Sequence, residues 1–255
     1  MGRRVLILKK SRFLHFFTNT FLSGNITFLK GKNNRFTGRL APLRLCTCIT
    51  VNGRNNRISF SNGILNRCRV YIQGSGNTLT IDDDCSIHHA VIWIVGNHNT
   101  ITLGKRVQIF NADLGAEDTS SIMLMQDGAR VGGYVALGLG HNKTILSRIY
   151  ASEGRTVSIG KESAVSDAVT IRTSDSHSIL NGGARINPAK DVIIGNNVWI
   201  CSGAVLLKGA GVGDGCILGG NSMLTKDYTA SKHSLLAGTP AKPIRENVSW
   251  NFNVE

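Results

Sequence analysis

A histidine and an aspartate stand two residues apart in the segment Arg172-Thr173-Ser174-Asp175-Ser176-His177-Ser178. Histidine is the side chain best matched to taking a proton near neutral pH. In extended backbone, side chains two residues apart project to the same side. Asp175 could therefore fix the tautomer of His177 or bind acceptor hydroxyls, or it could cap a loop as an Asx turn. His177, with Asp175 beside it, is therefore the first candidate for proton transfer, and a structural loop histidine is the alternative.

Trp199, in the segment Val198-Trp199-Ile200, is the second candidate. It directly precedes an aliphatic residue that we expect to point into the core, so its indole should point outward. Large exposed aromatic side chains mark binding surfaces more often than bare solvent. We interpret Trp199 as a binding residue. Packing between subunits is the open alternative, and the two roles can coexist.

The elements that position these residues are predicted by repeats. The motif Gly-x-x-Asn recurs in the first half of the chain, with glycines at 31, 53, 74 and 96 and spacings of 22, 21 and 22 residues. Gly and Asn tolerate positive φ, so each copy predicts a tight corner between two short apolar strands. A corner at a fixed period is typical of a chain that coils and stacks on itself.

The second half has a sharper period of six. Its large aliphatic residues are Ile194, Ile200, Leu206, Val212, Leu218 and Leu224, and Ile159, Val165 and Ile171 keep the same period upstream. Small or medium residues follow four positions later, at Val198, Ala204, Ala210, Cys216 and Ser222. This period fits neither a helix nor a long strand. It predicts a three-sided coil whose inward aliphatic residues stack on their counterparts one coil away.

The same period locates the loop. Continued from Ile171, it would place His177 at an inward position, where an imidazole fits poorly. Residues Asn181 to Pro188 do not follow the period. We therefore expect the coil to open into a protruding loop near Asp175, with His177 at the loop base and facing outward.

These hexads resemble those of the hexapeptide-repeat acyltransferases, whose fold is a left-handed parallel β-helix. The hand is taken from the resemblance, because left-handed crossovers are rare. The resemblance covers residues 155–247, and the N-terminal repeats resemble the looser coils of polysaccharide O-acetyltransferases. Their spacing would also suit another solenoid, so the hand of these coils is open. We expect an all-β chain with basic coils at 1–150 and a hexapeptide β-helix with a C-terminal tail at 151–255, in one continuous solenoid.

The resemblance also implies roles. It makes His177 the catalytic base and places Trp199 in the donor and acceptor pocket, with Ser202 on the pantetheine arm of acetyl-CoA. Cys201 stands where many relatives have glycine, which leaves the donor channel in question. Gly220 would let the backbone approach the ligand. Contacts to the adenosine and phosphates fall on Thr225, Lys226, Lys242 and Arg245.

Three cations around one terminus suit a ligand that carries several phosphates. The resemblance further implies a homotrimer with sites between adjacent prisms, and a reaction that needs no metal.

The charge of the chain is unevenly distributed. The formal net charge of the 255 residues is +13, yet the first acidic residue is Asp82, after fourteen Lys and Arg. Such a field attracts polyanions, whether nucleic acid, anionic lipid headgroups or acidic polysaccharide. Solvated residues at strand edges are the alternative. Together with the family resemblance, this charge leads us to expect an acidic polysaccharide, and no nucleic acid, as the binding partner. Peripheral contact with a membrane through Phe13–Phe17 is left undecided.

Compartment and redox state are predicted more simply. No run approaches the length of a membrane-spanning helix, and no secretory signal is recognised. The six cysteines lack zinc-site spacing, so we interpret them as small, reduced core or corner residues. We expect a cytoplasmic protein, with the inner face of the membrane as one location.

Together these observations predict an acetyl-CoA-dependent O-acetyltransferase acting on a hydroxyl of an acidic bacterial surface polysaccharide or its precursor. No Ser or Cys with a neighbouring base is evident, which favours direct transfer over an acyl-enzyme. One alternative is an N-acetyltransferase acting on a nucleotide-activated amino sugar. Another is a non-catalytic solenoid that binds polyanions through residues 3–69.

Overall fold

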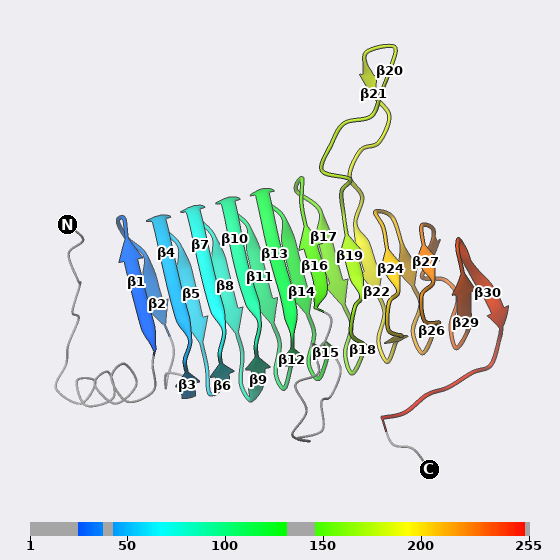
Figure 1. Cartoon of the computed structure of the whole chain (residues 1–255), viewed down its shortest axis with the longest axis horizontal. Coiled ribbons are helices and arrows are strands. Elements are labelled where there is room, and N and C mark those ends of the chain that lie inside the picture. The colour runs from blue at the N-terminus through cyan, green and yellow to red at the C-terminus, as the bar shows by residue number, and fades with distance from the viewer. Residues whose placement is uncertain (1–24, 38–42, 132–145, 253–255) are drawn as a thin grey trace.

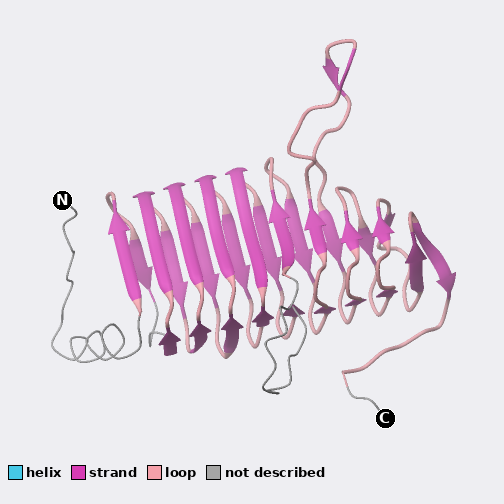
Figure 2. Cartoon of the chain, in the orientation of Figure 1, coloured by secondary structure: helices cyan, strands magenta, loops and turns pink. Residues whose placement is uncertain are grey.

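The computed structural model describes residues 25–37, 43–131 and 146–252. These residues form a long three-sided coil of short strands, and none of them is helical (Figures 1 and 2). In this part of the chain there is accordingly no helix of the length and hydropathy that crossing a membrane requires. The segment Phe13–Phe17 lies outside the described residues.

Three parallel sheets run along the coil. The first contains β1 (Ile26–Lys30), β4 (Cys48–Arg54), β7 (Arg69–Ser75), β10 (Val91–Asn97), β13 (Ala112–Thr119), β16 (Ser147–Ala151), β19 (Thr170–Arg172), β24 (Val205–Leu206) and β27 (Met223–Leu224). The second contains β2 (Arg35–Thr37), β5 (Arg57–Phe60), β8 (Thr78–Ile81), β11 (Thr100–Leu103), β14 (Ile122–Met125), β17 (Thr156–Ile159), β22 (Val192–Ile194), β25 (Gly211–Val212) and β28 (Asp227–Tyr228). The third contains β3 (Leu43–Leu45), β6 (Gly63–Asn66), β9 (Cys85–His88), β12 (Gln108–Phe110), β15 (Arg130–Val131), β18 (Ala164–Val165), β23 (Trp199–Ile200), β26 (Ile217–Leu218) and β29 (Leu235–Gly238), closed by the antiparallel β30 (Ala241–Arg245).

Every coil visits the three sheets in the same order, from β1–β2–β3 to β27–β28–β29. The winding sense therefore cannot change between the N-terminal repeats and the hexapeptide coils. The left hand implied by the family resemblance would extend to the N-terminal coils as well. The predicted parallel β-helix with a protruding loop and a C-terminal tail is confirmed.

The coil length changes along the chain. Partner residues in the first sheet are 22 or 21 positions apart in the early coils, as in Ile26 with Cys48 and Cys48 with Arg69. The spacing falls to 18 where Val205 pairs with Met223. It rises to 35 twice, and the second jump, from Thr170 to Val205, contains the protruding loop. Three hexads thus make one full coil only after this loop.

The core is the stack of inward aliphatic side chains that the six-residue period predicts. Ile194 pairs in register with Val212, and Ile200 with Leu218, and all four side chains are buried. Burial of each such side chain stabilises the fold by roughly 1.5–3 kcal/mol relative to leaving it exposed. The small residues at Ala204, Ala210 and Ser222 are buried at the corners.

The Gly-x-x-Asn corners form two ladders. Gly53 and Gly74 pair in register with positive φ, and a Cβ on either would collide with the carbonyl of the next glycine in the stack. Beside them Asn77 is fully buried; its Nδ2 donates to the Gly96 carbonyl at 2.8 Å and its Oδ1 accepts from the Asn99 amide at 2.9 Å. The motif therefore supplies both a close backbone approach and the hydrogen bonds that the corner needs.

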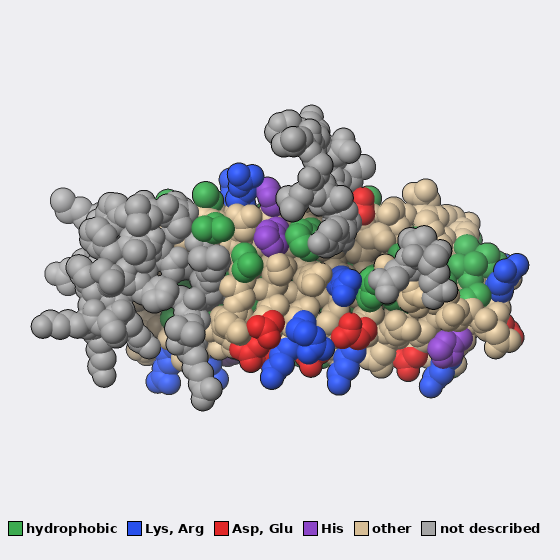
Figure 3. Space-filling view, turned by 90° about the horizontal axis from the view of Figure 1, so that it is seen from below, with side chains coloured by type: hydrophobic (Ala, Val, Ile, Leu, Met, Phe, Trp, Pro, Cys, Tyr) green, Lys and Arg blue, Asp and Glu red, His purple; other side chains and the backbone are tan. Residues whose placement is uncertain are grey.

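Surface charges follow the corners. In the view from below, basic and acidic side chains are interspersed along one long edge of the molecule (Figure 3). The exposed pair of Lys105 with Asp83 joins neighbouring coils, and the exposed pair of Arg106 with Glu162 reaches across the coil that lies between them. Seven basic residues before Asp82 have described side chains that are all exposed, on the first and second sheets and at corners of the first coils: Lys30, Lys32, Arg35, Arg54, Arg57, Arg67 and Arg69.

Candidate functional site

His177 lies at the base of the protruding loop. The loop leaves the coil after β19 and returns before β22, with a small hairpin of β20 (Leu180–Asn181) and β21 (Ala184–Arg185) at its tip (Figure 1). The His177 side chain is exposed. Within the described chain its imidazole has no hydrogen-bond partner, so both ring nitrogens are open to a bound molecule.

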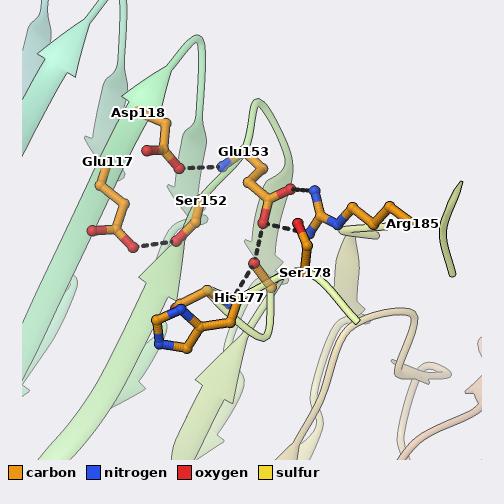
Figure 4. A pocket seen from close by; sticks show the side chains of 9 residues that line it. Glu117, Asp118, Ser152, Glu153, His177, Ser178 and Arg185 are labelled. Carbon is orange, nitrogen blue, oxygen red and sulfur yellow. Dashed lines mark hydrogen bonds and ion pairs between the residues drawn. The ribbon is translucent and has the colours of Figure 1, made fainter. Parts of the chain in front are cut away.

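A polar pocket of about 530 Å³ opens beside this imidazole. Its walls come from the end of β13, the turn after β16 and the two legs of the loop. The ring lies toward Glu117 and away from Arg185 (Figure 4). The lining is rich in hydroxyls and carboxylates: Glu117, Asp118, Ser152, Glu153, Ser174, Ser176, His177, Ser178 and Arg185. Such a lining suits a ligand with many hydroxyl groups.

Asn187 ties the two legs of the loop together. Its side chain is almost completely buried. Nδ2 donates to the carboxylate of Asp175 and to the carbonyl of His177, both at 2.8 Å. Oδ1 accepts from the Ile179 amide at 2.6 Å and from Nε of Arg185 at 3.4 Å. One amide thus uses its full hydrogen-bonding capacity to fix the backbone that carries the imidazole.

Two ion pairs clamp the loop base from the neighbouring coils. On one side Glu153 accepts from Arg185 and from the hydroxyl of Ser174. Arg185, followed by Ser174, lowers the pKa of Glu153 to about 2. On the other side Lys208 pairs with Asp175, and Lys208 followed by Asn187 lowers the pKa of that carboxyl. Both carboxylates are ionised near neutral pH.

This network assigns a contact to Asp175. Its Oδ2 is engaged by Lys208 and Asn187 rather than by the imidazole of His177. Among the roles that the sequence left open for Asp175, these contacts are those of a residue that fixes the loop. The roles of Asp175 in tautomer choice and in acceptor binding stay predictions.

Trp199 points outward, as expected, with 37% of its surface exposed. Its Nε1 donates to the hydroxyl of Ser166 at 3.2 Å, and its ring packs on Trp250 with centroids 6.0 Å apart. Trp199 belongs to the third sheet, whereas His177 lies at the corner between the first and second sheets. A single chain therefore does not bring the two into one pocket.

The C-terminal segment after β30 returns along the third sheet and covers part of this face. Trp250 donates from Nε1 to the Asn197 carbonyl at 2.8 Å. Phe252 packs edge-on against Trp250, and the guanidinium of Arg130 lies 3.8 Å from the Phe252 ring centre. The fold-back tail is present, and it contacts Trp199 directly.

The remaining predicted residues fall into three places. Ser202 and Gly220 stack at the corner between the third and first sheets, where the Asn221 amide donates to the Ser202 carbonyl at 3.0 Å. Lys242 and Arg245 lie on β30, opposite Ala237 and Leu235. Thr225 and Lys226 lie between β27 and β28, at the corner of the first and second sheets. All six are exposed: Ser202, Gly220, Thr225, Lys226, Lys242 and Arg245.

Sequence reasoning missed Glu117 and Glu153, which line the pocket, and Asn187 and Lys208, which hold Asp175. A usable signal was present, because Glu153 lies one coil before Ser174, 21 residues earlier. The 35-residue jumps in coil length hid Glu117 and Lys208. Glu117 and Ser152, now joined by a hydrogen bond, are 35 residues apart, and Asp175 and Lys208 are 33 apart.

The described residues contain no group of three His, Cys, Asp or Glu side chains placed to hold a metal. No disulfide joins the six cysteines, and Cys68, Cys85 and Cys216 are buried, as expected of core residues. Their reduced state stays a prediction. Cys201 is half-buried, and burial raises the pKa of its thiol. Its effect on a donor channel stays a prediction.

Comparison with known proteins agrees with this geometry. Residues 191–226 match the family model described as "Bacterial transferase hexapeptide (six repeats)". A polysialic acid O-acetyltransferase of Neisseria meningitidis is 29% identical over 160 residues, which are 62% of this chain and 68% of that protein. A chloramphenicol acetyltransferase of Agrobacterium fabrum (strain C58 / ATCC 33970) is 44% identical over 59 residues.

The second match is local, since it spans 23% of this chain and about a quarter (27%) of the relative. The fold extends much further. A solved structure of a polysialic acid O-acetyltransferase superimposes with a TM-score of 0.64 and 24% identity, covering 91% of this chain and 92% of that one. At this identity the superposition establishes the fold.

Proposed function

We propose that this chain, a hexapeptide-repeat β-solenoid, is an acetyl-CoA-dependent O-acetyltransferase that modifies a hydroxyl group of a polysaccharide. The observation that carries the proposal is the imidazole of His177, which has no partner among the described residues and lies at a pocket lined by hydroxyls and carboxylates. The match of residues 191–226 to the bacterial transferase hexapeptide model, together with the similarity to proteins described as acetyltransferases, supports the choice of donor.

In the proposed reaction His177 takes the proton of the acceptor hydroxyl as that oxygen attacks the thioester carbonyl carbon. The new C–O ester bond forms and the C–S bond breaks. The imidazolium then returns its proton to the departing thiolate, so the ring ends the cycle neutral. The clamp formed by Asn187, Glu153 and Lys208 holds the backbone of the base in place during both transfers.

The donor side requires a second copy of the chain. Trp199, Ser202, Gly220, Lys242 and Arg245 lie on or beside the third sheet, away from His177. A closed ring of three chains would set this side of one prism against the His177 corner of the next. In such a homotrimer Trp199 lines the pocket, and Lys242 and Arg245 on β30 of one chain face the phosphates of acetyl-CoA together with Thr225 and Lys226, which lie at the same corner as His177, of the next chain.

The acceptor is an acidic polysaccharide of a bacterial surface, or its precursor. Two of the similar proteins are described as polysialic acid O-acetyltransferases, and polysialic acid is anionic. The acid-free coils before Asp82 supply a positive field that draws such a polymer toward the molecule. The donor and the six free thiols support a cytoplasmic location; the inner face of the membrane is the alternative.

The test is acetyl transfer by the His177→Ala variant. Loss of the base should lower kcat for a polysialic acid acceptor by about two to four orders of magnitude, while the melting temperature stays near that of the wild type because the side chain is exposed. His89→Ala, which removes an exposed imidazole elsewhere, is the matched control and should keep its activity. Near-full activity of His177→Ala would refute the assignment of the base.

A further inference from the structure

The outer face of the first sheet carries a row of aromatic side chains. In register across seven neighbouring strands stand Phe28, Thr50, Tyr71, Trp93, Gly115, Tyr150 and Arg172, here called the aromatic row. Phe28 and Tyr71 have exposed fractions of 58% and 37%. With strands about 4.8 Å apart, the row is about 29 Å long.

The middle of the row is held in a fixed shape. Gly115 has no side chain, and the Trp93 ring occupies the space that a Cβ there would fill. The carboxylate of Asp113 accepts from Trp93 Nε1 at 2.7 Å and from the Tyr150 hydroxyl at 2.9 Å. Burial, followed by the bond to Asp113, raises the pKa of Tyr150 to about 12, so its hydroxyl remains a donor. Two aromatic rings are thus held rigidly, with centroids 5.5 Å apart.

Cations flank the row. Arg69 and Arg148 are exposed and stand in the adjacent register row of the same face. Arg148 is next to Asp113, whose carboxylate accepts from the two aromatics, and Arg69 stands two strands away from it. Arg172 ends the aromatic row itself. Aromatic rings with arginines beside them suit a chain of sugar rings that bears carboxylates, since each ring offers an apolar face to stack and Arg binds carboxylate.

The row leads directly to the pocket. Arg172 donates to the hydroxyl of Ser176 at 2.7 Å, next to His177. Glu117, Ser152 and Ser174, which line the pocket, follow two residues after Gly115, Tyr150 and Arg172 along the same strands or the turns that end them. A chain bound on the row would therefore reach the pocket without leaving the first sheet.

The other two faces differ. The second sheet presents mainly small hydroxyl side chains outward, among them Thr78, Thr80, Thr100, Thr102 and Ser158. On the third sheet Trp199 is packed against Trp250 of the C-terminal segment.

We propose that the aromatic row binds an extended anionic polysaccharide, which stacks sugar rings on Tyr71 and Trp93, meets Arg69, Arg148 and Arg172 with its acidic groups, and delivers a hydroxyl to His177. The inference deepens the proposed function and rests on it. The row then acts as a specificity surface for long acceptors, distinct from the pocket where transfer occurs.

The experiment measures binding of long polysialic acid, polygalacturonic acid and neutral dextran to the full chain without acetyl-CoA. We expect an acidic polymer to bind. Tyr71→Ala and Trp93→Ala should each raise its Kd about fivefold to tenfold. In transfer assays the same variants should raise KM for the long polymer and keep both kcat and the KM for a sialic acid dimer. Phe110→Ala, an aromatic removal on the third sheet, is the control and should bind normally.

Each outcome is decisive. Wild-type binding by Tyr71→Ala and Trp93→Ala, or no binding of any acidic polymer by the wild type, overturns the inference while leaving the transfer assay to judge the proposed function. A changed sedimentation coefficient in these variants also overturns it, because the row would then be an interface between copies. Tyr71→Ala keeps the test valid if Trp93→Ala unfolds. Polymer binding that depends on the row, in a protein that transfers no acetyl group, would refute the proposed function alone.

Discussion

At the scale of single residues, the His177 loop depends on charges contributed by different coils. Glu153 belongs to the coil before the loop and Lys208 to the coil after it, and each pairs with a loop residue. Side chains in these pairs are partly exposed, so each pair alone contributes little to stability. Their shared effect is to hold the two legs, together with Asn187, in one position.

Acid should release the Glu153 side of this clamp. The pKa of Glu153 is about 2 in the folded chain against an ordinary 4.5, so the pair with Arg185 stabilises the fold above pH 4.5, and this stabilisation is lost as the pH falls toward 2. We expect the melting temperature of Glu153→Gln to lie below that of the wild type near neutral pH, with the gap closing between pH 4.5 and 2. Thermal unfolding followed by circular dichroism across this range checks the sign.

The matched control is Glu162→Gln, whose pair with Arg106 is at least half exposed on both sides. It should change the melting temperature little at any pH. A gap for Glu153→Gln that widens in acid would contradict the assigned direction.

Only some residues of the site could be predicted from the sequence, and the reason is physical. His177 and Asp175 stand out because they break a period of six, which sequence alone reveals. Lys208 contacts Asp175, and Glu153 contacts Ser174, through coil stacking, and the inserted loop changes the spacing between stacked positions from 21 to 33 or 35. Asn187 contacts Asp175 and His177 from the returning leg of the loop, whose path the period does not predict. The candidate catalytic residues could therefore be predicted where the period is interrupted, whereas the residues that hold them in place could not.

At the scale of elements, the corners of the early coils determine whether successive coils can stack. Gly74 combines a φ of 121° with a position at which a Cβ would meet the carbonyl of Gly96. Gly74→Ala should therefore destabilise the fold by more than the roughly 0.5–1 kcal/mol that separates Gly from Ala by conformational freedom. Urea unfolding measures the difference.

Gly182→Ala is the control for this change. Gly182 also has positive φ, but a Cβ added to it in the hairpin turn would meet nothing within 4 Å. The substitution should lower the free energy of unfolding by little more than the strain of a non-glycine residue at positive φ in a turn. Equal losses for the two variants would show that the stacked carbonyl is not the cause.

The regular elements were predictable because backbone geometry repeats. Large aliphatics six apart gave the buried stack from Ile194 to Leu224, and the Gly-x-x-Asn spacing gave the corners. The aromatic row was not anticipated. Its members are spaced by whole coils and by one 35-residue jump, and nothing local to Tyr71 or Trp93 distinguishes an outward strand position that binds a ligand from one that faces solvent.

At the scale of the whole molecule, the separation of His177 from Trp199 makes the proposed site dependent on assembly. If neighbouring chains complete it, His177→Ala and Trp199→Ala proteins, each inactive alone, should regain activity when unfolded together and refolded as mixed oligomers. Random mixing in equal amounts would restore about a quarter of the sites. Acetyl transfer by the mixture, against each variant refolded separately, is the measurement.

Sedimentation of the wild type under the same conditions gives the number of chains. A monomer with full activity, or mixed oligomers without any recovered activity, would contradict a site shared between chains. The continuity of the three sheets from β1 to β29 makes each chain a single rod, so any such recovery must come from contact between rods.

Each coil pairs with the next through the same three strand positions. Such a chain can therefore lengthen or shorten during evolution only by complete coils. Duplication or loss of one 22-residue winding between Asn34 and Asn99 would shift the far end by about 4.8 Å along the axis. The geometry around His177 would not change. In this architecture the length of the surface that binds a polymer and the site that reacts with it can therefore be selected independently.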